Sequence, residues 1–438
     1  MGLAVLTVVK NNSTMKQLFT LIALIAGSLL IQAQSVTLPQ ASPKAKTLQT
    51  IGLTDVAVIY HRPSVNDRDI WGALIPYNQV WRAGANENTV IILSDDVEIG
   101  GKSLAAGKYG LHMIPGEEEC TVIFSKNATS WGSFSYNPSE DALRVTVKPQ
   151  EASAHHEMLT FSFENVTLES AECVLSWDDL SIPFKIKVNT HEVVVENLRN
   201  ELRTQPGFTW LGWNQAANYC LRNDVNLQEA LTWANRSVFM NPQVQNIATH
   251  ARLVSKVNGD GTNADDIIVQ TIESDLGNHS VTWREYNGLA NFVLQNMNDV
   301  ETAMKWIDKS IEMSPNMTNM MAKVNLLDTK GKKDEAKKLR ADALALGSNF
   351  ELNNYGYQLL FSGDAPGAVQ VFEANVKNNP DDPNAWDSLG EGYLNNGQKD
   401  KAIEAFETSL SKNPPANVKA NSIKLLKQLG VEYEPGRS

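Results

Sequence analysis

The chain has 438 residues, of which 42% are hydrophobic, and a formal net charge of −12 at pH 7. This length exceeds what one hydrophobic core usually holds, so we expect two or three domains. The apolar content is ordinary for a globular protein, and the acidic balance supplies no basic surface for a phosphate backbone. The composition therefore excludes a nucleic-acid-binding role.

The first 34 residues have the pattern of an export signal. Lys16 precedes an apolar run over residues 18–31, and Ala33 is a small residue at which a signal peptidase would cut. The run is shorter than the roughly 20 residues that span a bilayer, which favours a cleaved signal over an anchor. We interpret residues 1–34 as a signal peptide, with Met15 as an alternative start. We expect a periplasmic or secreted protein with envelope association and no transmembrane anchor after cleavage.

Residues 35–192 contain short stretches typical of β-strands. Val56, Val58 and Tyr60 alternate with less apolar neighbours, and further runs follow at 89–93, 107–114, 120–124, 143–147, 158–166, 171–177 and 182–188. Turn-rich pieces separate these runs. Short strands with such turns predict an antiparallel β-sandwich. We interpret residues 151–154 as one of the loops.

Three cysteines are too few for a disulfide framework in a chain of this length. Cys120 and Cys173 lie in predicted strands, where either a disulfide or two buried free thiols would fit, and buried thiols are the favoured interpretation. Cys220 lies in a predicted helix and is assigned to the core.

Residues 193–430 change to helical spacing, with a pattern that repeats every 34 residues. Trp386, Leu389, Gly390, Tyr393, Ala402, Phe406 and Pro414 correspond to Leu352, Tyr355, Gly356, Leu359, Ala368, Phe372 and Pro380. This period is typical of stacked helix pairs, because one pair cannot bury its apolar face alone. We therefore predict an all-α solenoid, ending in a capping helix after Pro415 and a tail at 431–438. The residues assigned to packing between its helices are Gly356, Ala368, Trp386, Gly390, Tyr393, Ala402 and Phe406.

These residues resemble tetratricopeptide repeats over about 195–430. The match is nearly complete between Trp386 and Pro414, and it is good between Leu352 and Pro380. The resemblance implies a right-handed superhelix whose concave groove holds an extended peptide or a helix of a partner protein. Groove residues vary with the ligand in this family, so none is assigned.

The segment His61–Thr89 combines arginines, tryptophans, a histidine and an acid in one predicted loop. Loops carried on a rigid sandwich often hold binding groups. Arginine forks bind carboxylate or phosphate, and a histidine can transfer a proton. The tentative ligand-binding residues are His61, Arg62, Arg82, Asn86 and Glu87. His61 and Arg62 are neighbours on a predicted strand, so their side chains face opposite sides unless a bulge intervenes.

A structural role for the same segment is equally consistent with its residues. In this alternative, Trp71 and Trp81 close the end of the sandwich. The arginines would then be neutralised by Asp67, Asp69 and Glu87.

The first unit also resembles a known family, called domain of unknown function 2911, across residues 42–188. The resemblance depends on the stretches at 42–45, 60–89, 107–116 and 131–145. This family occurs in exported bacterial proteins, often joined to tetratricopeptide repeats, and its activity is not established. The resemblance therefore supports a separate domain at these residues and implies no particular reaction or ligand.

Other candidate sites are weaker. His155, His156 and Glu157 suit a solvated turn better than a metal site, so no metal is assigned. Trp131, Phe134 and Tyr136 fit either a platform for a sugar ring or aromatics that pack a turn onto the sheet. No nucleophile motif is present, and no cofactor is expected.

Two functional hypotheses follow. The favoured one is a non-enzymatic envelope protein whose repeats bind a protein or peptide partner and whose sandwich binds a small or anionic ligand. The alternative is an enzyme of unknown reaction with its site around His61–Thr89.

Overall fold

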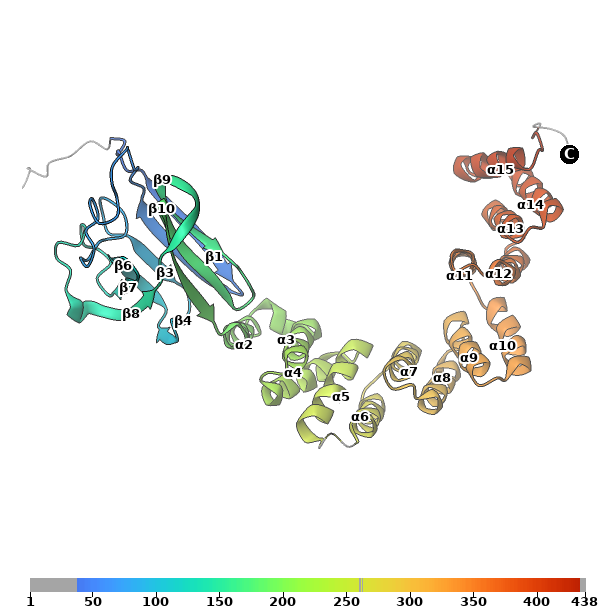
Figure 1. The fold of residues 1–438 in the computed structure, drawn as a ribbon. Helices are drawn as coiled ribbons and strands as arrows, with labels where there is room; N and C mark the ends of the chain where they lie inside the picture. The colour runs from blue at the N-terminus through green and yellow to red at the C-terminus, as the bar shows by residue number, and fades with distance from the viewer. Residues whose placement is uncertain (1–37, 260, 262, 434–438) are drawn as a thin grey trace, which may run out of the picture. The chain divides into compact units, whose positions relative to one another are not determined.

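The computed structural model describes residues 38–433 except 260 and 262 (Figure 1), so the predicted signal peptide lies outside the described residues. The chain divides into two compact units, the first ending at Val194 and the second beginning at Val195. Within the part of the chain that the structure describes, no helix is both long enough and apolar enough to cross a membrane.

Within the described residues, the first unit consists of ten strands in two open antiparallel sheets. The strands are β1 (Lys44–Ile51), β2 (Thr54–His61), β3 (Val90–Leu93), β4 (Val97–Ile99), β5 (Lys102–Leu104), β6 (Gly107–Pro115), β7 (Cys120–Ser125), β8 (Asp141–Val147), β9 (Gln150–Glu164) and β10 (Ser170–Val188), with a 3-10 turn at Pro138–Glu140. One sheet has the order β1-β2-β3-β6-β7-β8 and the other β5-β4-β10-β9. The rings of Phe124 and Phe184 meet edge to face between the sheets, 5.8 Å apart. The predicted sandwich is confirmed.

The second sheet differs from the prediction at two places. β9 begins at Gln150 and contains residues 151–154, so the predicted loop there and the solvated turn at His155 are wrong. This part of β9 is mostly exposed and has no apolar alternation, which is why the strand pattern is missing from its sequence. β10 joins two predicted strands through shifts of register around Asp178, which has a positive φ of 56°. A bulge of this kind lets one strand continue through residues that resemble a turn.

All three cysteines are buried free thiols. Cys120 lies in β7 and Cys173 in β10, each with no exposed surface. The interpretation as buried thiols is confirmed, and Cys220 lies in the core of the second unit as expected.

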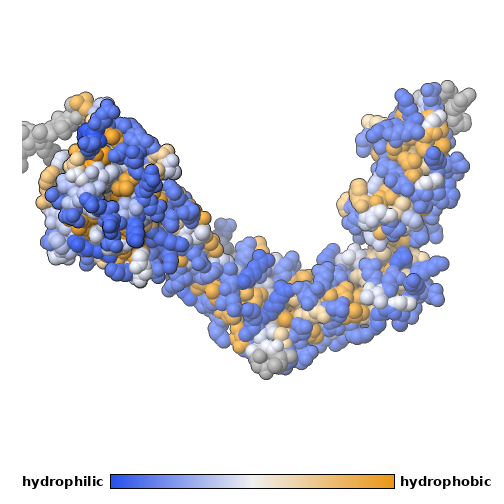
Figure 2. Space-filling model, in the orientation of Figure 1, coloured by the Kyte–Doolittle hydropathy of each residue, from blue (hydrophilic) through white to orange (hydrophobic). Residues whose placement is uncertain are grey.

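In the part of the chain that the structure describes, the second unit is a run of fourteen helices. They are α2 (Thr190–Glu201), α3 (Trp210–Asn223), α4 (Leu227–Met240), α5 (Val244–Asn258), α6 (Ala264–Asn278), α7 (Trp283–Met297), α8 (Val300–Met313), α9 (Met317–Thr329), α10 (Lys333–Ala345), α11 (Asn349–Phe361), α12 (Ala365–Asn378), α13 (Pro383–Asn395), α14 (Lys399–Ser411) and α15 (Ala416–Gln428), with a 3-10 turn at Gln205–Phe208. α15 packs on α14 and α13 and covers the last pair. Apolar residues are visible as patches between helices on a mainly hydrophilic face (Figure 2). The predicted solenoid is confirmed.

Glycines in the last two pairs let the second helix approach the first closely. A Cβ on Gly390 would lie 2.5 Å from Cε1 of Phe406, and one on Gly356 would lie 2.3 Å from Cε1 of Phe372. Both phenylalanine rings are fully buried, as are the neighbouring alanines at 368 and 402. Each ring therefore occupies the space that a side chain at the glycine would fill.

Two further residues of this region form hydrogen bonds near the surface. Trp386 donates from Nε1 to the carbonyl of Pro380 over 2.8 Å, and the Tyr393 hydroxyl donates to Oε1 of Glu373 over 2.7 Å. These bonds tie α13 to the turn and to the helix before it.

A longer recurrence, not visible in the 34-residue pattern, relates α3 and α4 to α7 and α8. The equivalent residues, 73 positions apart, include Trp210 and Trp283, Asn214 and Asn287, Asn218 and Asn291, Trp233 and Trp306, and Ser237 and Ser310. Their contacts also recur: the Ser237 hydroxyl donates to the carbonyl of Trp210 over 2.7 Å, and the Ser310 hydroxyl to that of Trp283 over 2.8 Å. The array therefore contains two similar helix pairs, α3–α4 and α7–α8.

Candidate functional sites

The His61–Thr89 segment joins β2 to β3 and is tied to both sheets. Trp81 exchanges two backbone hydrogen bonds of 2.8 Å with Met113 of β6 in the first sheet. The amide of Val65 donates to the carbonyl of Glu157 of β9 in the second sheet over 2.7 Å. These anchors fix the segment although it contains almost no regular strand.

Three tryptophans hold the middle of the segment in the core. The rings of Trp81 and Trp177 stack with centroids 6.0 Å apart, and Trp71 meets both edge to face at 5.8 and 6.2 Å. Trp71 donates from Nε1 to the carbonyl of Trp177, and Trp81 donates to that of Gly84. The alternative in which Trp71 and Trp81 close the end of the sandwich fits this arrangement.

The arginines of the segment do not form the predicted ion pairs. Arg62 donates from Nε and Nη2 to the carbonyl of Leu159 and the hydroxyl of Thr160, both in β9. Arg68 donates to the carbonyls of residues 64 and 65. Among the described residues, neither these two nor Arg82 pairs with an acid, so the predicted neutralisation by residues 67, 69 and 87 is wrong. For Arg68, carbonyls of the irregular segment take the place of the acids, and for Arg62 two acceptors of β9 do so.

His61 and Glu87 form the one direct contact among the five predicted ligand residues. Nε2 of His61 lies 3.1 Å from Oε2 of Glu87, and the imidazole is buried while the carboxylate is half exposed. Burial lowers the pKa of His61 against the opposing effect of the Glu87 charge. The neutral ring then keeps its proton on Nε2 to donate to Glu87, which leaves Nδ1 as an acceptor. Nδ1 is buried without a partner in the described structure.

Arg82 and Asn86 lie in a fixed turn before β3. Thr89 donates from its hydroxyl to the carbonyl of Ala83 over 3.0 Å, and Ala83 is fully buried with a positive φ of 51°. Asn86 donates from Nδ2 to the carbonyl of Ser42 over 3.1 Å and thus holds the chain before β1. Asn86 therefore serves the turn, whereas Arg82 has no hydrogen bond or ion pair within the described residues.

A cavity of about 440 Å³ lies beneath this segment. Thirteen of its sixteen lining residues belong to His61–Thr89, and the others are Ala41, Ser42 and Trp177. Of the five predicted ligand residues only Arg82 lines it, so the assignment of the full set stays a prediction. Sequence reasoning missed Trp177, because it enters from β10, far along the chain, and no local motif marks it.

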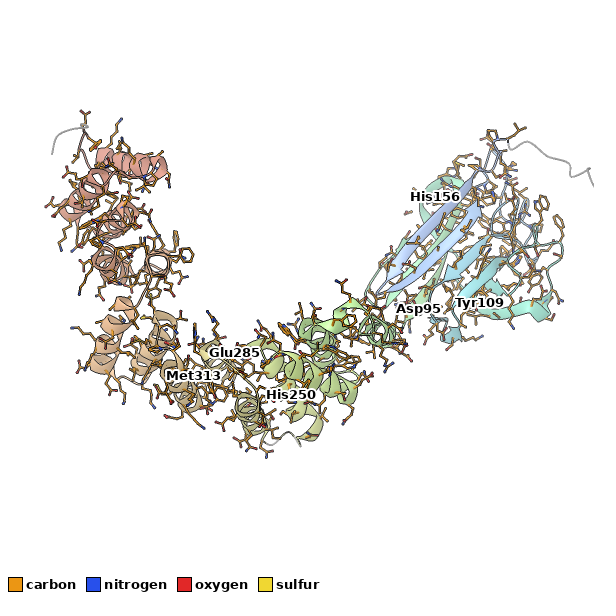
Figure 3. The ribbon with its side chains drawn as sticks, turned by 180° about the vertical axis from the view of Figure 1, so that it is seen from behind. Asp95, Tyr109, His156, His250, Glu285 and Met313 are labelled. Carbon is orange, nitrogen blue, oxygen red and sulfur yellow. The ribbon has the colours of Figure 1, made fainter. Side chains whose placement is uncertain are left out.

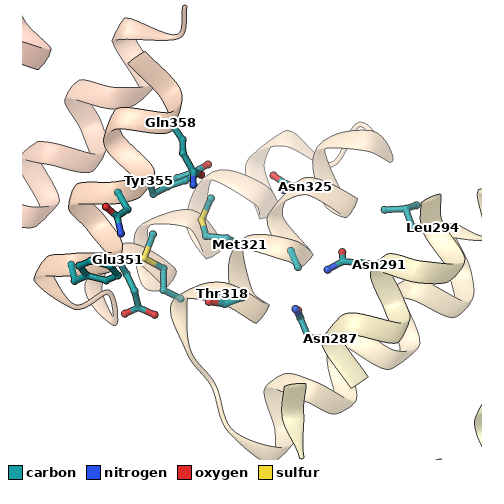
Figure 4. A pocket seen from close by; sticks show the side chains of 13 residues that line it. Asn287, Asn291, Leu294, Thr318, Met321, Asn325, Glu351, Tyr355 and Gln358 are labelled. Atoms are coloured by element: carbon teal, nitrogen blue, oxygen red, sulfur yellow. The ribbon is translucent and has the colours of Figure 1, made fainter. Parts of the chain in front are cut away.

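A second hollow, of about 510 Å³, lies in the helical array between α7, α9 and α11. Carboxamides line it: Asn287, Asn291, Asn325, Asn354 and Gln358. Figure 4 shows Asn287 and Asn291 on α7 facing the side chains of α9, with those of α11 beyond. Asn287 is 9% exposed, and its Oδ1 is buried without a hydrogen-bond partner.

The remaining candidates are exposed or already paired. His155 groups with Asp178 and Asp179 so that one ligand atom of each lies within 4.8 Å of the others, but the group is largely exposed and no metal is assigned to it. His250 of α5, labelled in Figure 3, lies 2.7 Å from the Asp275 carboxylate, and both are buried. These groups satisfy one another without a ligand.

The aromatic turn after β7 resolves into two parts. The rings of Trp131 and Phe134 stack at 6.1 Å with both side chains exposed, which contradicts their packing onto the sheet. Tyr136 instead donates to the Asp141 carboxylate and lies against His112. A three-residue platform is therefore not formed.

Comparisons with known proteins cover both units. Residues 383–416 match the tetratricopeptide repeat model, and residues 42–186 match the family described as Protein of unknown function (DUF2911). No curated protein matches the sequence.

Similar solved structures align with about half of the chain. One is the APC/C hetero-tetramer Cut9-Hcn1, with 16% identity over 55% of this chain and 46% of that one and a TM-score of 0.24. Yeast Tom70 has 13% identity over 55% of this chain and 59% of its own, with a TM-score of 0.27. A tetratricopeptide repeat protein from Parabacteroides merdae has 15% identity over 53% of this chain and 91% of its own, with a TM-score of 0.26. The match spans less than two thirds of the length of the first two. The chain thus carries a domain of the DUF2911 family followed by tetratricopeptide repeats.

Proposed function

We propose that the helical array binds an extended segment of a partner protein in the hollow between α7, α9 and α11. The set of carboxamides that lines this hollow is the observation that carries this proposal. Carboxamides can donate to and accept from the backbone of an extended peptide, and most of those in the hollow are exposed.

The other lining residues support the same type of ligand. Asn291, Asn325 and Asn354 are exposed carboxamides, and each offers a donor and an acceptor to the backbone of a peptide. Met317 and Met321 give the floor an apolar surface that adapts to different side chains. An extended chain with small apolar side chains fits these walls.

Selection of peptides on the full-length protein from a random library tests the proposal. We expect the selected peptides to bind about ten-fold more weakly to Asn291→Ala and Asn325→Ala, the loss of one or two hydrogen bonds. Asn395→Ala is the matched control, because Asn395 is an exposed helical residue outside the hollow. Peptides that bind all three variants like the wild type would refute the proposed site.

We also propose that the protein is exported to the periplasm or secreted and associates with the envelope, which the apolar run at 18–31 supports. Cell fractionation and N-terminal sequencing test this. The expected mature protein begins near Gln34, and Ile22→Arg should leave the precursor uncleaved in the cytoplasm. A wild-type protein that keeps residues 1–34 in the cytoplasm would contradict export.

A second binding role is proposed for the first unit, which would hold a small ligand in the cavity beneath His61–Thr89. The size of the cavity and the contribution of one continuous segment to most of its wall support this role.

A further inference from the structure

We propose that this cavity binds a small organic carboxylate, held by the guanidinium of Arg82 with its apolar body against Trp81 and Trp177. The inference rests on the proposed ligand-binding role of the first unit and names the ligand class and the residues. It concerns neither the helical hollow nor the peptide partner.

The charge of the cavity wall favours an anion. Arg68 and Arg82 line it, and no lining residue is acidic. Arg68 already gives two of its donors to carbonyls, whereas Nε of Arg82 is buried without a partner. Burial also lowers the pKa of Arg82, since a desolvated cation lacks compensation here. One anionic group would supply that compensation.

Trp177, which also lines the cavity, carries a second unused donor. Trp177 is 1% exposed and its Nε1 is buried without a partner, although Trp71 and Trp81 both donate to carbonyls. An indole N–H can only donate, as can a guanidinium. Both unsatisfied groups of the cavity wall therefore require an acceptor, and a carboxylate offers two acceptor oxygens.

The rest of the wall requires an apolar ligand body. Leu74, Ile75, Pro76 and Val80 line the cavity together with the tryptophan rings. A bare inorganic anion would leave this surface uncovered, while a ring or short aliphatic chain would fill it. The volume of about 440 Å³ falls within the range of small-molecule sites.

The turn that presents Arg82 is fixed in the unliganded protein. Ala83 has a left-handed backbone conformation that a residue with a Cβ rarely adopts, and two side chains of the turn hold the carbonyls of Ala83 and Gly84. These contacts fix the backbone on either side of Arg82, so its guanidinium starts from a defined point of the cavity wall.

Calorimetry and ligand-observed NMR on the full-length protein test the inference with benzoate, hexanoate, benzamide, benzylamine and phenyl phosphate. We expect saturable binding of benzoate and hexanoate, and binding of benzamide at least about ten-fold weaker, because one charge-assisted contact is lost. Arg82→Gln should weaken benzoate binding about ten-fold. Trp177→Phe, which keeps an aromatic ring and removes the indole N–H, should also weaken it. Lys108→Gln, an exposed residue of β6 with the same charge change, should bind like the wild type.

Melting temperatures add an independent readout. Arg82→Gln should raise the melting temperature of the unliganded protein, because it removes an unpaired, partly buried charge. Benzoate should raise that of the wild type and have little effect on the variant. A lower melting temperature for Arg82→Gln, with unchanged benzoate affinity, would show that Arg82 is structural. Arg82→Lys, which keeps the charge and loses the planar fork, provides a second variant if Trp177→Phe does not fold.

The panel separates the ligand class from the binding role. Benzamide or benzylamine binding as tightly as benzoate, with sensitivity to Trp177→Phe, would overturn the carboxylate and keep the ligand-binding role. Tighter binding of phenyl phosphate than of benzoate would assign the site to phosphate esters instead. If no compound of the panel binds, both the class and the role are wrong, while the peptide proposal is unaffected.

Discussion

Replacing Gly390 by alanine tests whether the close contact between α13 and α14 determines the stability of the last repeat. The added Cβ would lie 2.5 Å from the Phe406 ring, a distance at which one of the two groups must move. Phe406 is fully buried, so its ring cannot turn out into solvent.

Two opposing contributions set the size of the effect. Overpacking of a core costs about 1–3 kcal/mol. Alanine in place of glycine inside a helix returns about 0.5–1 kcal/mol. We expect Gly390→Ala to lower the free energy of unfolding of the last repeat by about 1 kcal/mol, the difference between the middles of these two ranges.

A matched glycine and a double mutant isolate the steric contribution. Gly277 also lies in a helix, and its Cβ would meet no atom within 4 Å, so Gly277→Ala should not lower stability. Phe406→Leu should cost less in the Gly390→Ala background than alone, with a coupling energy on the order of 1 kcal/mol.

The assay must resolve single repeats, since such arrays often unfold in stages. Urea unfolding followed by circular dichroism gives the total effect, and hydrogen exchange of peptides from α13 and α14 locates it. Wild-type stability in Gly390→Ala together with zero coupling to Phe406→Leu would refute the steric argument.

The remaining predictions concern the first unit and the buried thiols. Burial lowers the pKa of His112 to about 4, below the roughly 6.5 of an unfolded histidine. The contribution of the neutral His112 ring to the stability of the fold is therefore complete above pH 6.5 and is lost as the pH falls towards 4. Between pH 6.5 and 4 the melting temperature of His112→Gln should therefore fall less than that of the wild type. The corresponding difference in free energy of unfolding is up to about 3 kcal/mol. Parallel plots of melting temperature against pH for the two proteins would exclude the effect. Burial raises the pKa of Cys120 to about 12 and that of Cys220 to about 11, and Cys173 has no exposed surface, so a thiol reagent at pH 8 should label the native protein far more slowly than the urea-unfolded protein. Rapid native labelling of one thiol would contradict that burial.

The architecture was predictable because local patterns carry it. The alternation around Val56 reflects one buried sheet face, and the glycines at 356 and 390 mark positions where a ring must fit. Prediction failed at the start of β9, where backbone pairing forms the strand and the side chains show no apolar alternation. It also failed at Asp178, where a bulge in β10 has the sequence of a turn.

The site was predictable only as a region. The His61–Thr89 segment does enclose a cavity, yet its chemistry depends on which donors remain unused, and that is set by tertiary contacts. Arg62 and Arg82 look alike in sequence, but β9 satisfies the first and nothing described satisfies the second. Trp177 approaches from another strand and adds a donor that no local motif indicates.

The recurrence of α3–α4 in α7–α8 suggests how the array gained its length. A duplicated block ends with the surface that its own beginning can cover, so a tandem copy can be inserted without a new core. Asn287 and Asn291 have counterparts in Asn214 and Asn218, and Oδ1 of Asn214 is likewise buried without a partner. Under the proposed peptide-binding role, the recurrence would give the array a second set of recognition groups, and one set could diverge towards a new partner while the other keeps the old one.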